Sequence, residues 1–520
     1  MEQLQAEDVD DLQASPDVPA RICSVHGNNA RALGVALARV YRRRLEAGLE
    51  RARGYYTVLA PVTCSMELWR TLSGYLRAGV QRSCPNAAMF LEGLEQELGW
   101  DVYQTQLDFE IYTLELHRRT RVRKALARSK AGPAGSGRPS SGSSSDASSS
   151  GGSSSSLAAA LTCAEEREGA AAAEPPVPEP AAAKEQSIHS GRCTGFGLSE
   201  PGGAQLVAQT VDLPGLLYGY GDFDCVLRLR TASGCTLAYD TDGRLCPIGL
   251  NSAGLGVGVF NLHQTQTEGF EQPSVSVQAL VWELLLGGHT LASAEAFLRE
   301  LPVPPMCGSA LVLTDASGAV IVELSPAGAC FCERVAGEPT VRANHALHPQ
   351  SAKTFGESGR ACADSRKRQR ALTEQLERWG QLRSADDLSP GCEEALAMLR
   401  GAKKVRNQSS LAAVACDLLR GELRVEFRER QEVSSEEIAR LAVKVGMAPE
   451  KVESFMSSGA IQKDAGRERL QTGLPAAHTT RWAAQSFFLS TGRPGPSGLQ
   501  ARSEEAKPEA KKTSWQRARS

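Results

Sequence analysis

The stretch Gly191-Arg-Cys-Thr-Gly-Phe-Gly-Leu198 marks the point at which this chain of 520 residues changes character. Before it, residues 128–192 are dominated by Ser, Gly, Ala and Pro. Such a composition cannot offset its chain entropy by burying apolar surface, so we expect a flexible linker that ends at Cys193. After it, residues 193–430 alternate short apolar runs with Gly-rich turns, which is typical of β-strands. The sequence therefore predicts that a folded core begins at Cys193.

The core predicted for residues 193–430 contains both strands and helices. Turn residues at 315–318 and 418–421 join neighbouring strands as hairpins, and helical periodicity appears between other strands. This order predicts an α+β fold in which helices cover antiparallel sheets. The expected strands are 205–211, 235–239, 256–262, 310–314, 319–324, 411–416 and 422–427, and the expected helices are 275–286, 292–301, 364–379 and 384–399.

Four further segments flank the linker and the core. Residues 1–20 are acidic and are expected to be disordered, as is the basic tail at 492–520. Residues 431–491 are expected to form a helical appendage. Residues 21–127 are expected to be helical, because apolar residues recur three or four positions apart on one face: Leu33, Leu37, Val40, Tyr41, Leu45 and Leu49.

The composition argues against several classes of partner. The 58 basic and 60 acidic residues give a formal net charge of −2, so we expect no overall attraction to nucleic acid or to an acidic membrane. No apolar run approaches the roughly 20 residues that span a bilayer, and the amino terminus lacks the basic start and apolar run of a secretory signal. We therefore expect a cytoplasmic protein whose fourteen scattered cysteines remain reduced.

Metal and cofactor motifs are weak in this sequence. Cys330 and Cys332 are one residue apart and have no second cysteine pair or suitably spaced histidine, so we expect no metal site. The sequence has no Walker-type phosphate loop, and the Gly-rich stretch 249–254 lacks the spacing of a dinucleotide fingerprint. We therefore expect no bound cofactor.

Four motifs in order carry a resemblance to a known family. They are Gly191–Leu198, Leu206-Val-Ala-Gln-Thr-Val-Asp212, Gly249-Leu-Asn-Ser-Ala-Gly-Leu-Gly-Val-Gly-Val-Phe-Asn261 and Val341-Arg-Ala-Asn-His345. Together they resemble the acyl-coenzyme A:6-aminopenicillanic acid acyltransferase family, which includes the β-alanyl-biogenic-amine hydrolases of insects. The resemblance implies the N-terminal-nucleophile (Ntn) hydrolase fold, a four-layer αββα sandwich, preceded here by a helical segment.

The resemblance also implies a self-cleaving precursor. In this family the thiol that corresponds to Cys193 attacks the carbonyl of the preceding residue, here Arg192, and an N-to-S acyl shift and hydrolysis follow. The freed α-amino group then serves as the base for its own sulfur, because a terminal amine has a pKa near ~7.7 to 8.0. The upstream segment is expected to remain bound as a noncovalent subunit.

The same resemblance assigns roles to Asp212 and Asn344, and three further residues are candidates beside them. Asp212 is expected to orient the new amino terminus, and Asn344 to fix that terminus and polarise the substrate carbonyl. Asn261 is the candidate amide donor of the oxyanion hole, since a neutral N–H suits that role. Thr194 and His345 are candidate substrate-binding residues. A small-molecule amide is the expected substrate, with β-alanyl amines and fatty N-acyl amines the first to test.

Two departures from the family pattern keep other functions open. The family usually has Gln-Asn-Trp-Asp where this chain has Gln209-Thr-Val-Asp212, and often Gly where this chain has Arg192. One alternative is an acyltransferase that passes the acyl group to an amine or to coenzyme A, with a coenzyme A thioester as co-substrate. Another is a noncatalytic scaffold on a degenerate Ntn fold. A papain-like pair of Cys193 with His345 or His348 is disfavoured, because the motif around Cys193 does not match that class.

Overall fold

The architecture comes from a computed structural model of the chain. It describes residues 21–59, 66–107, 110, 193–200, 203–212, 225–240, 243, 245–262, 270–332, 338–355, 360–382, 390–406, 410–428 and 482–489. The expectations for the acidic segment 1–20, the linker 128–192 and the basic tail 492–520 lie outside these residues.

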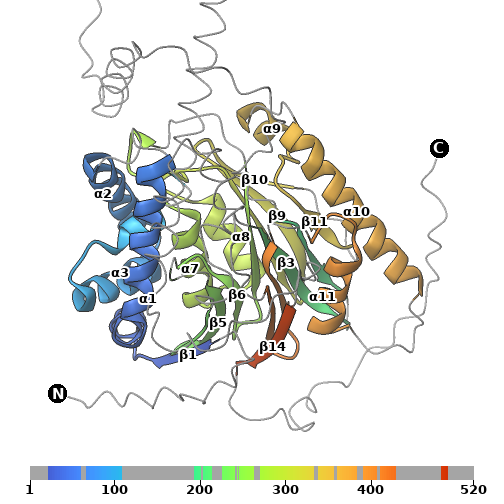
Figure 1. The fold of residues 1–520 in the computed structure, drawn as a ribbon, viewed down its shortest axis with the longest axis horizontal. Coiled ribbons are helices and arrows are strands. Elements are labelled where there is room, and N and C mark those ends of the chain that lie inside the picture. The colour runs from blue at the N-terminus through green and yellow to red at the C-terminus, as the bar shows by residue number, and fades with distance from the viewer. Residues whose placement is uncertain are drawn as a thin grey trace, which may run out of the picture. The chain divides into compact units, whose positions relative to one another are not determined.

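Two β-sheets form the centre of the fold (Figure 1). The eight-stranded sheet has the order β1-β4-β5-β6-β7-β8-β9-β10 and the six-stranded sheet the order β11-β2-β3-β12-β13-β14. All pairings are antiparallel except that of β1 with β4, which is parallel. The strands are β1 Arg21–His26, β2 Gly195–Ser199, β3 Gln205–Asp212, β4 Cys225–Thr231, β5 Gly234–Asp240, β6 Ile248–Asn251, β7 Gly256–Asn261, β8 Ser309–Asp315, β9 Gly318–Ser325, β10 Gly328–Phe331, β11 Thr340–Arg342, β12 Ser410–Asp417, β13 Glu422–Arg428 and β14 Trp482–Phe488.

Helices cover the outer face of each sheet. On the eight-stranded sheet, α1 contacts β1 and β4, and α7 contacts β5 and β6. On the six-stranded sheet, α11 contacts β3, β12 and β13, and α10 contacts β11. The helices are α1 Ala30–Leu59, α2 Met66–Ser83, α3 Pro85–Leu98, the 3-10 helix η1 Val102–Gln106, α7 Val277–Leu286, α8 Leu291–Arg299, α9 Pro349–Phe355, α10 Arg360–Leu382 and α11 Cys392–Gly401. The predicted α+β class and the four-layer αββα arrangement are confirmed.

Glycines allow the two sheets to approach closely. A Cβ added to Gly197 on β2 would lie 2.8 Å from Val312 Cγ1 on β8 of the other sheet. A Cβ added to Gly258 on β7 would lie 2.9 Å from Gln209 Oε1 on β3. Real Cβ atoms do not approach so closely, so these positions of the Gly-Phe-Gly and Gly-Val-Gly-Val motifs require glycine for inter-sheet packing rather than for a turn.

The segment upstream of Cys193 belongs to the same body as the core. Its strand β1 pairs with β4 over all six residues. Tyr41 Oη on α1 donates to Asp240 Oδ2 at the end of β5 over 3.0 Å. The buried Glu283 carboxylate on α7 accepts from the backbone N–H of Asn86 at 2.8 Å and of Ala87 at 2.9 Å, which caps the first turn of α3. Residues on both sides of the linker therefore share one hydrophobic core.

Several sequence-based boundaries need correction. Each of the seven expected strands is present. The segment 21–127 is not helical throughout, because Arg21–His26 is a strand, and the segment 431–491 is not a purely helical appendage, because Trp482–Phe488 is a strand paired with β13. The expected helix 384–399 begins, among the described residues, only at Cys392. Val40, expected in the core, is 40% exposed, whereas its neighbour Tyr41 is 2% exposed.

No described helix has the length and apolar character needed to cross a membrane.

Candidate active site

Cys193 lies at the start of β2, beside the end of β3. The backbone N–H of Thr194 donates to Thr210 Oγ1 at 3.1 Å, and the N–H of Thr210 donates to the carbonyl of Thr194 at 2.9 Å. From Gly195 onward the two strands pair in register, with Gly195 opposite Gln209. Because Asp212 ends β3, this register brings the predicted nucleophile and the predicted aspartate together. Both are buried, with Cys193 6% and Asp212 0% exposed.

The surroundings of Cys193 keep its sulfur protonated in the uncut chain. Burial and the charge of Asp212 raise the pKa of the Cys193 thiol to about 12. A hydrogen bond from the backbone of Asp212 and the charge of Arg368 act in the opposite direction but do not compensate. At pH 7 a thiol with this pKa is a thiolate in about one molecule in 10⁵, so the sulfur needs a base to react.

Arg368 on α10 connects three parts of the site. Its Nη1 donates to the carbonyl of Cys193 at 2.9 Å and to Thr194 Oγ1, and its Nη2 donates to Asn344 Oδ1 at 3.1 Å. Its Nε donates to Asp364 Oδ2 at 3.2 Å, one turn earlier on the helix. The side chain is 3% exposed. One buried guanidinium therefore fixes the start of β2 relative to the loop that follows β11.

Asn344 and Asn261 are also in contact. Asn344 Nδ2 donates to the backbone carbonyl of Asn261 at the end of β7, over 2.9 Å. The backbone N–H of Asn344 donates to Ser365 Oγ on α10 at 2.8 Å. The side-chain amide of Asn344 is thus held from both sides, by Asn261 and by Arg368. Asn261 enters this contact through its backbone, whereas its predicted role used its side-chain amide.

His345 is a neutral, buried member of the same loop. Its Nδ1 lies 2.8 Å from Ser365 Oγ. Burial, together with the charges of Arg342, Arg366 and Arg368, lowers the pKa of His345 to about 4, although a hydrogen bond with Gln369 opposes this. A histidine with this pKa is a weak base at neutral pH, which agrees with the expectation that Cys193 has no histidine partner. The position is compatible with the predicted substrate contact.

The structure thus brings five predicted site residues to one place and leaves one undescribed. Cys193, Thr194, Asp212, Asn344 and His345 are all buried around the junction of β2, β3 and the loop after β11. Asn261 reaches this junction through its carbonyl. Arg192 lies outside the described residues.

Arg368 and Gln209 are site residues that the sequence reasoning missed. Ser365, Arg368, Leu372 and Leu376 form the buried stripe of α10 at helical spacing, so an arginine at a core position was a visible signal. Gln209, two strand positions before Val211, donates from Nε2 to the carbonyl of Val259 at 3.0 Å and accepts from its N–H at 2.6 Å. β6 pairs with β7 only at Gly256 and Val257, so this pairing does not extend to Val259. Gln209 supplies the hydrogen-bond partners of the N–H and the carbonyl of Val259 instead.

One side of Cys193 is apolar. One compact hydrophobic cluster contains Cys193 together with Phe260, Leu262, Ala310, Val312, Ile321 and Ala346. These residues come from β7, β8, β9 and the loop after β11. The side of the nucleophile that faces this cluster is therefore suited to an apolar group rather than to a charge.

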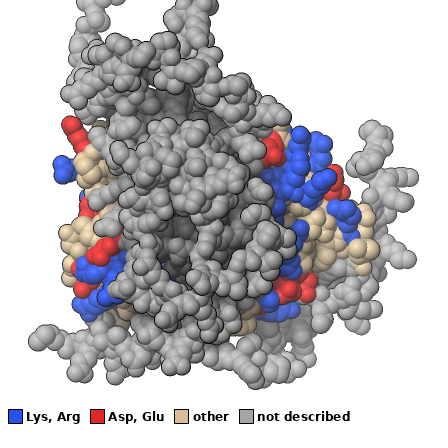
Figure 2. All heavy atoms as spheres, in the orientation of Figure 1, with Lys and Arg blue, Asp and Glu red and all other residues tan. Residues whose placement is uncertain are grey.

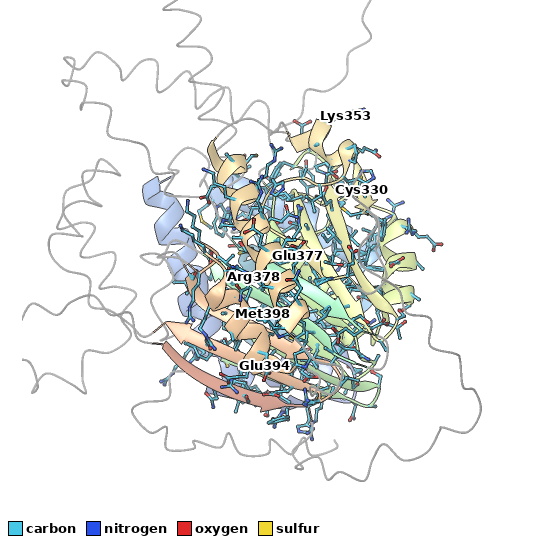
Figure 3. The ribbon with its side chains drawn as sticks, turned by 90° about the vertical axis from the view of Figure 1, so that its right-hand side faces the viewer. Cys330, Lys353, Glu377, Arg378, Glu394 and Met398 are labelled. Carbon is cyan, nitrogen blue, oxygen red and sulfur yellow. The ribbon has the colours of Figure 1, made fainter. Side chains whose placement is uncertain are left out.

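The outer surface beside the site is basic. Lys353 on α9 and Arg366, Lys367 and Arg370 on α10 are exposed, and Figure 2 shows blue side chains gathered on the side where Figure 1 places these helices. Figure 3 views this side, with Lys353 at the end of the molecule away from Met398 and Glu394 on α11. Because the charge of Arg366 acts on His345, this basic surface lies close to the site. Among the described residues no cluster of His, Cys, Asp and Glu side chains could hold a metal ion.

Comparisons with known proteins give a match to one family model over part of this chain and matches to solved structures. The family model of acyl-coenzyme A:6-aminopenicillanic acid acyltransferase matches residues 237–431, so Cys193 and Asp212 lie before the matched region. No curated protein sequence matches the chain.

The solved structures that are similar to this chain include three at low sequence identity. They are a Caenorhabditis elegans N-acylethanolamine-hydrolyzing acid amidase ortholog (14% identity, 44% of this chain and 93% of that one, TM-score 0.33), a variant of the conjugated bile acid hydrolase from Clostridium perfringens (12%, 46% and 91%, TM-score 0.29) and the penicillin V acylase from Agrobacterium tumefaciens (14%, 45% and 82%, TM-score 0.25).

The family match covers the sheets and helices from β5 to β13, and two of the four motifs that carry the resemblance, 249–261 and 341–345, fall in that range. Over this region the chain is similar to the acyl-coenzyme A:6-aminopenicillanic acid acyltransferase family.

Proposed function

We propose that this chain is a self-processing amidohydrolase that cuts before Cys193 and then uses Cys193 to cleave a linear amide. The observation that carries the proposal is the fixation of the Cys193 carbonyl and the Thr194 hydroxyl by Arg368, with the backbone of Asp212 at the sulfur. Cys193 is also the first described residue after the segment 128–192. A buried structural cysteine would not require a buried guanidinium at its own carbonyl.

The first reaction is the cleavage of the chain. The sulfur of Cys193 attacks the carbonyl carbon of Arg192, the bond from that carbon to the nitrogen of Cys193 breaks, and this nitrogen takes the proton that the thiol loses. Water then hydrolyses the thioester, which releases the carboxylate of Arg192 and restores the thiol. Asn344, held by Arg368 and Asn261, is the candidate donor to the oxyanion that forms in each step.

The second reaction uses the new amino terminus. The free α-amine of Cys193, with an ordinary pKa near ~7.7 to 8.0, accepts the thiol proton, for which His345 is poorly suited because its pKa is lowered to about 4. The sulfur then attacks the acyl carbon of the substrate, the amine product leaves with the proton, and water resolves the acyl-cysteine thioester. The buried Asp212 is the candidate to orient the α-amine.

The upstream segment is proposed to stay bound after cleavage. The pairing of β1 with β4, the Tyr41–Asp240 hydrogen bond and the Glu283 cap on α3 all join residues before the cut to residues after it. These contacts do not depend on the linker, so its scission removes none of them.

The apolar wall favours one of the two substrate classes. A β-alanyl group would place an ammonium against Phe260, Leu262 and Ile321, whose side chains offer it no hydrogen-bond acceptor. A fatty N-acyl amine would instead bury apolar surface there, at about 25 cal/mol per Å². We therefore rank N-acyl amines with an apolar acyl chain first.

A second candidate, acyl transfer to coenzyme A, is favoured by the basic surface of Lys353, Arg366, Lys367 and Arg370. Phosphate groups are attracted to such a surface. Product analysis separates the two: a free acid forms by hydrolysis with or without coenzyme A, whereas a coenzyme A thioester forms only by transfer.

The test of the proposal compares the full chain with the Cys193→Ala variant. Intact masses and amino-terminal sequences should reveal a fragment of residues 1–192 and a fragment that begins Cys-Thr-Gly-Phe, in the unmutated protein only. The two fragments should elute together in size-exclusion chromatography. A folded chain that stays uncut, and that remains uncut when Arg192 is replaced by Gly, would refute the proposal and favour the scaffold alternative.

A further inference from the structure

A buried ion pair joins the two sheets directly behind the loop that carries Asn344 and His345. Glu323 lies on β9 of the eight-stranded sheet and Arg342 on β11 of the six-stranded sheet. Arg342 Nη2 and Glu323 Oε1 are 2.9 Å apart, and both side chains are 0% exposed. The loop of residues 343–348 leaves β11 at Arg342 and reaches α9 at Pro349.

The same carboxylate holds the far end of that loop. Glu323 Oε1 accepts from the backbone N–H of Leu347 at 2.6 Å, and Oε2 accepts from the N–H of His348 at 3.1 Å. At the near end, Ser365 accepts from the N–H of Asn344. The loop has no strand or helix ladder, so these side chains supply acceptors that its backbone needs.

The energetics of the pair argue against a purely stabilising role. Replacing a buried ion pair by apolar residues is often neutral or stabilising, because two charges no longer have to be desolvated. What an apolar replacement cannot supply is the two acceptors for Leu347 and His348, and a buried N–H without an acceptor is destabilising. The loop would have to move to satisfy these groups, and Asn344 is three residues from Leu347.

We propose that Glu323, held by Arg342, is a positioning residue: it fixes the 343–348 loop so that the amide of Asn344 faces the carbonyl attacked by Cys193. The inference rests on the proposed function of Cys193 and Asn344 and adds the element that sets their relative geometry. Neither Glu323 nor Arg342 touches the reacting atoms, and both act through the backbone of the loop.

A graded pair of double variants tests this role. E323Q/R342M removes both charges but keeps one carbonyl acceptor, whereas E323M/R342M removes both acceptors. The proposal predicts that the rate of self-cleavage falls in the order wild type, E323Q/R342M, E323M/R342M, by on the order of 10-fold and then 10²-fold, since small misplacements of catalytic groups have effects of this size. For a cleaved variant, kcat on an N-acyl amine should fall while KM changes little.

The matched control is the pair of Glu426 and Arg406, whose side chains are 6% and 14% exposed and whose atoms are 2.9 Å apart. Glu426 lies on β13, two strands away from β3 in the sheet. E426M/R406M removes a comparable ion pair and should leave the cleavage rate within about 3-fold of wild type.

Hydrogen exchange gives a readout that does not depend on activity. Exchange of the amides in 343–348, measured by mass spectrometry on the uncut Cys193→Ala chain, should accelerate at least 10-fold when E323M/R342M is added and remain unchanged with E426M/R406M. Equal cleavage rates and equal exchange in all three double variants would overturn the positioning role. If the wild-type chain stayed uncut while exchange at 343–348 was faster in E323M/R342M, the proposed function would be refuted and the positioning of the loop by Glu323 would stand. If E323M/R342M failed to fold, the comparison of E323Q/R342M with wild type would still test the positioning role.

Discussion

Replacing Arg368 should slow self-cleavage far more than it lowers stability. The perturbation is Arg368→Met, which keeps an unbranched apolar stem and removes the guanidinium. Four hydrogen bonds are lost: three within the site, to the carbonyl of Cys193, to Thr194 Oγ1 and to Asn344 Oδ1, and one to Asp364 on the same helix. Hydrogen bonds to a charged group contribute about 1.5–3 kcal/mol each.

These contributions are not additive, so we expect a loss of roughly 2–3 kcal/mol in the cleavage transition state, which is about 30-fold to 10²-fold in rate. Arg368→Lys should fall between wild type and Arg368→Met, because an ammonium retains the charge but cannot reproduce the planar fork. Arg378→Met is the control on the same helix (Figure 3), since Arg378 is exposed and bonds only to its own helix among the contacts described.

The pH dependence provides a second, independent signal. The charge of Arg368 lowers the pKa of the Cys193 thiol, so its removal raises that pKa further. The cleavage rate of Arg368→Met should therefore rise toward higher pH than that of wild type, whereas Arg368→Lys should show little displacement. The assay is cell-free translation followed by quenching at timed intervals and quantification of uncut chain. Wild-type cleavage by a folded Arg368→Met chain would refute the assigned role.

Three further predictions follow from buried polar groups away from the sulfur. Glu283→Gln should weaken the cap on α3 by about 1 kcal/mol and make the two fragments separate at a lower urea concentration after cleavage, as size-exclusion chromatography would detect. Burial raises the pKa of Asp240 from 3.8 to about 6, so the proton that it retains contributes stability below about pH 4 that is lost as the pH rises through 6. The shift corresponds to roughly 3 kcal/mol, and this part of the slope in the free energy of unfolding between pH 4 and 6 should disappear in Asp240→Asn. Gln209→Leu should lower the free energy of unfolding by about 1–3 kcal/mol, because the N–H and carbonyl of Val259 lose their partner, and equal unfolding midpoints would contradict this.

The strands that could be predicted from the sequence are those with a local signal. β8 and β9 are apolar runs on either side of a recognisable turn, and β12 and β13 are a second such pair. β1 and β14 carry no equivalent signal, because each becomes a strand only through a partner elsewhere in the chain. β1 pairs with β4, about 200 residues later, and β14 pairs with β13 across the segment 429–481. Pairing at this sequence separation overrides local propensity.

The sequence predicts the site residues that stand in a motif. It does not predict those whose role depends on a contact made only in the folded chain. Cys193, Asp212 and Asn344 each stand in a short motif that carries the family resemblance. Arg368 stands in a helix rich in basic residues, most of which are solvated, and only its place on the stripe with Leu372 and Leu376 separates it from them. Gln209 looked like the remnant of an altered motif, but its amide bridges β3 to Val259 in the opposite sheet.

Cleavage at Cys193 should be coupled to folding, because the groups that would drive it come together only in the folded core. Asp212 arrives with β3, Asn344 with the loop after β11, and Arg368 with α10, which lies on the outer face of the six-stranded sheet. In the unfolded chain Arg368 is 175 residues from Cys193, so no local contact can substitute for its hydrogen bond to the Cys193 carbonyl. The upstream segment would already be paired to β4 at that stage, since the cluster that buries β1 and α1 also contains β5 and β7. The order of events, first folding and then scission, would therefore leave the two fragments joined by the contacts that made the cut possible.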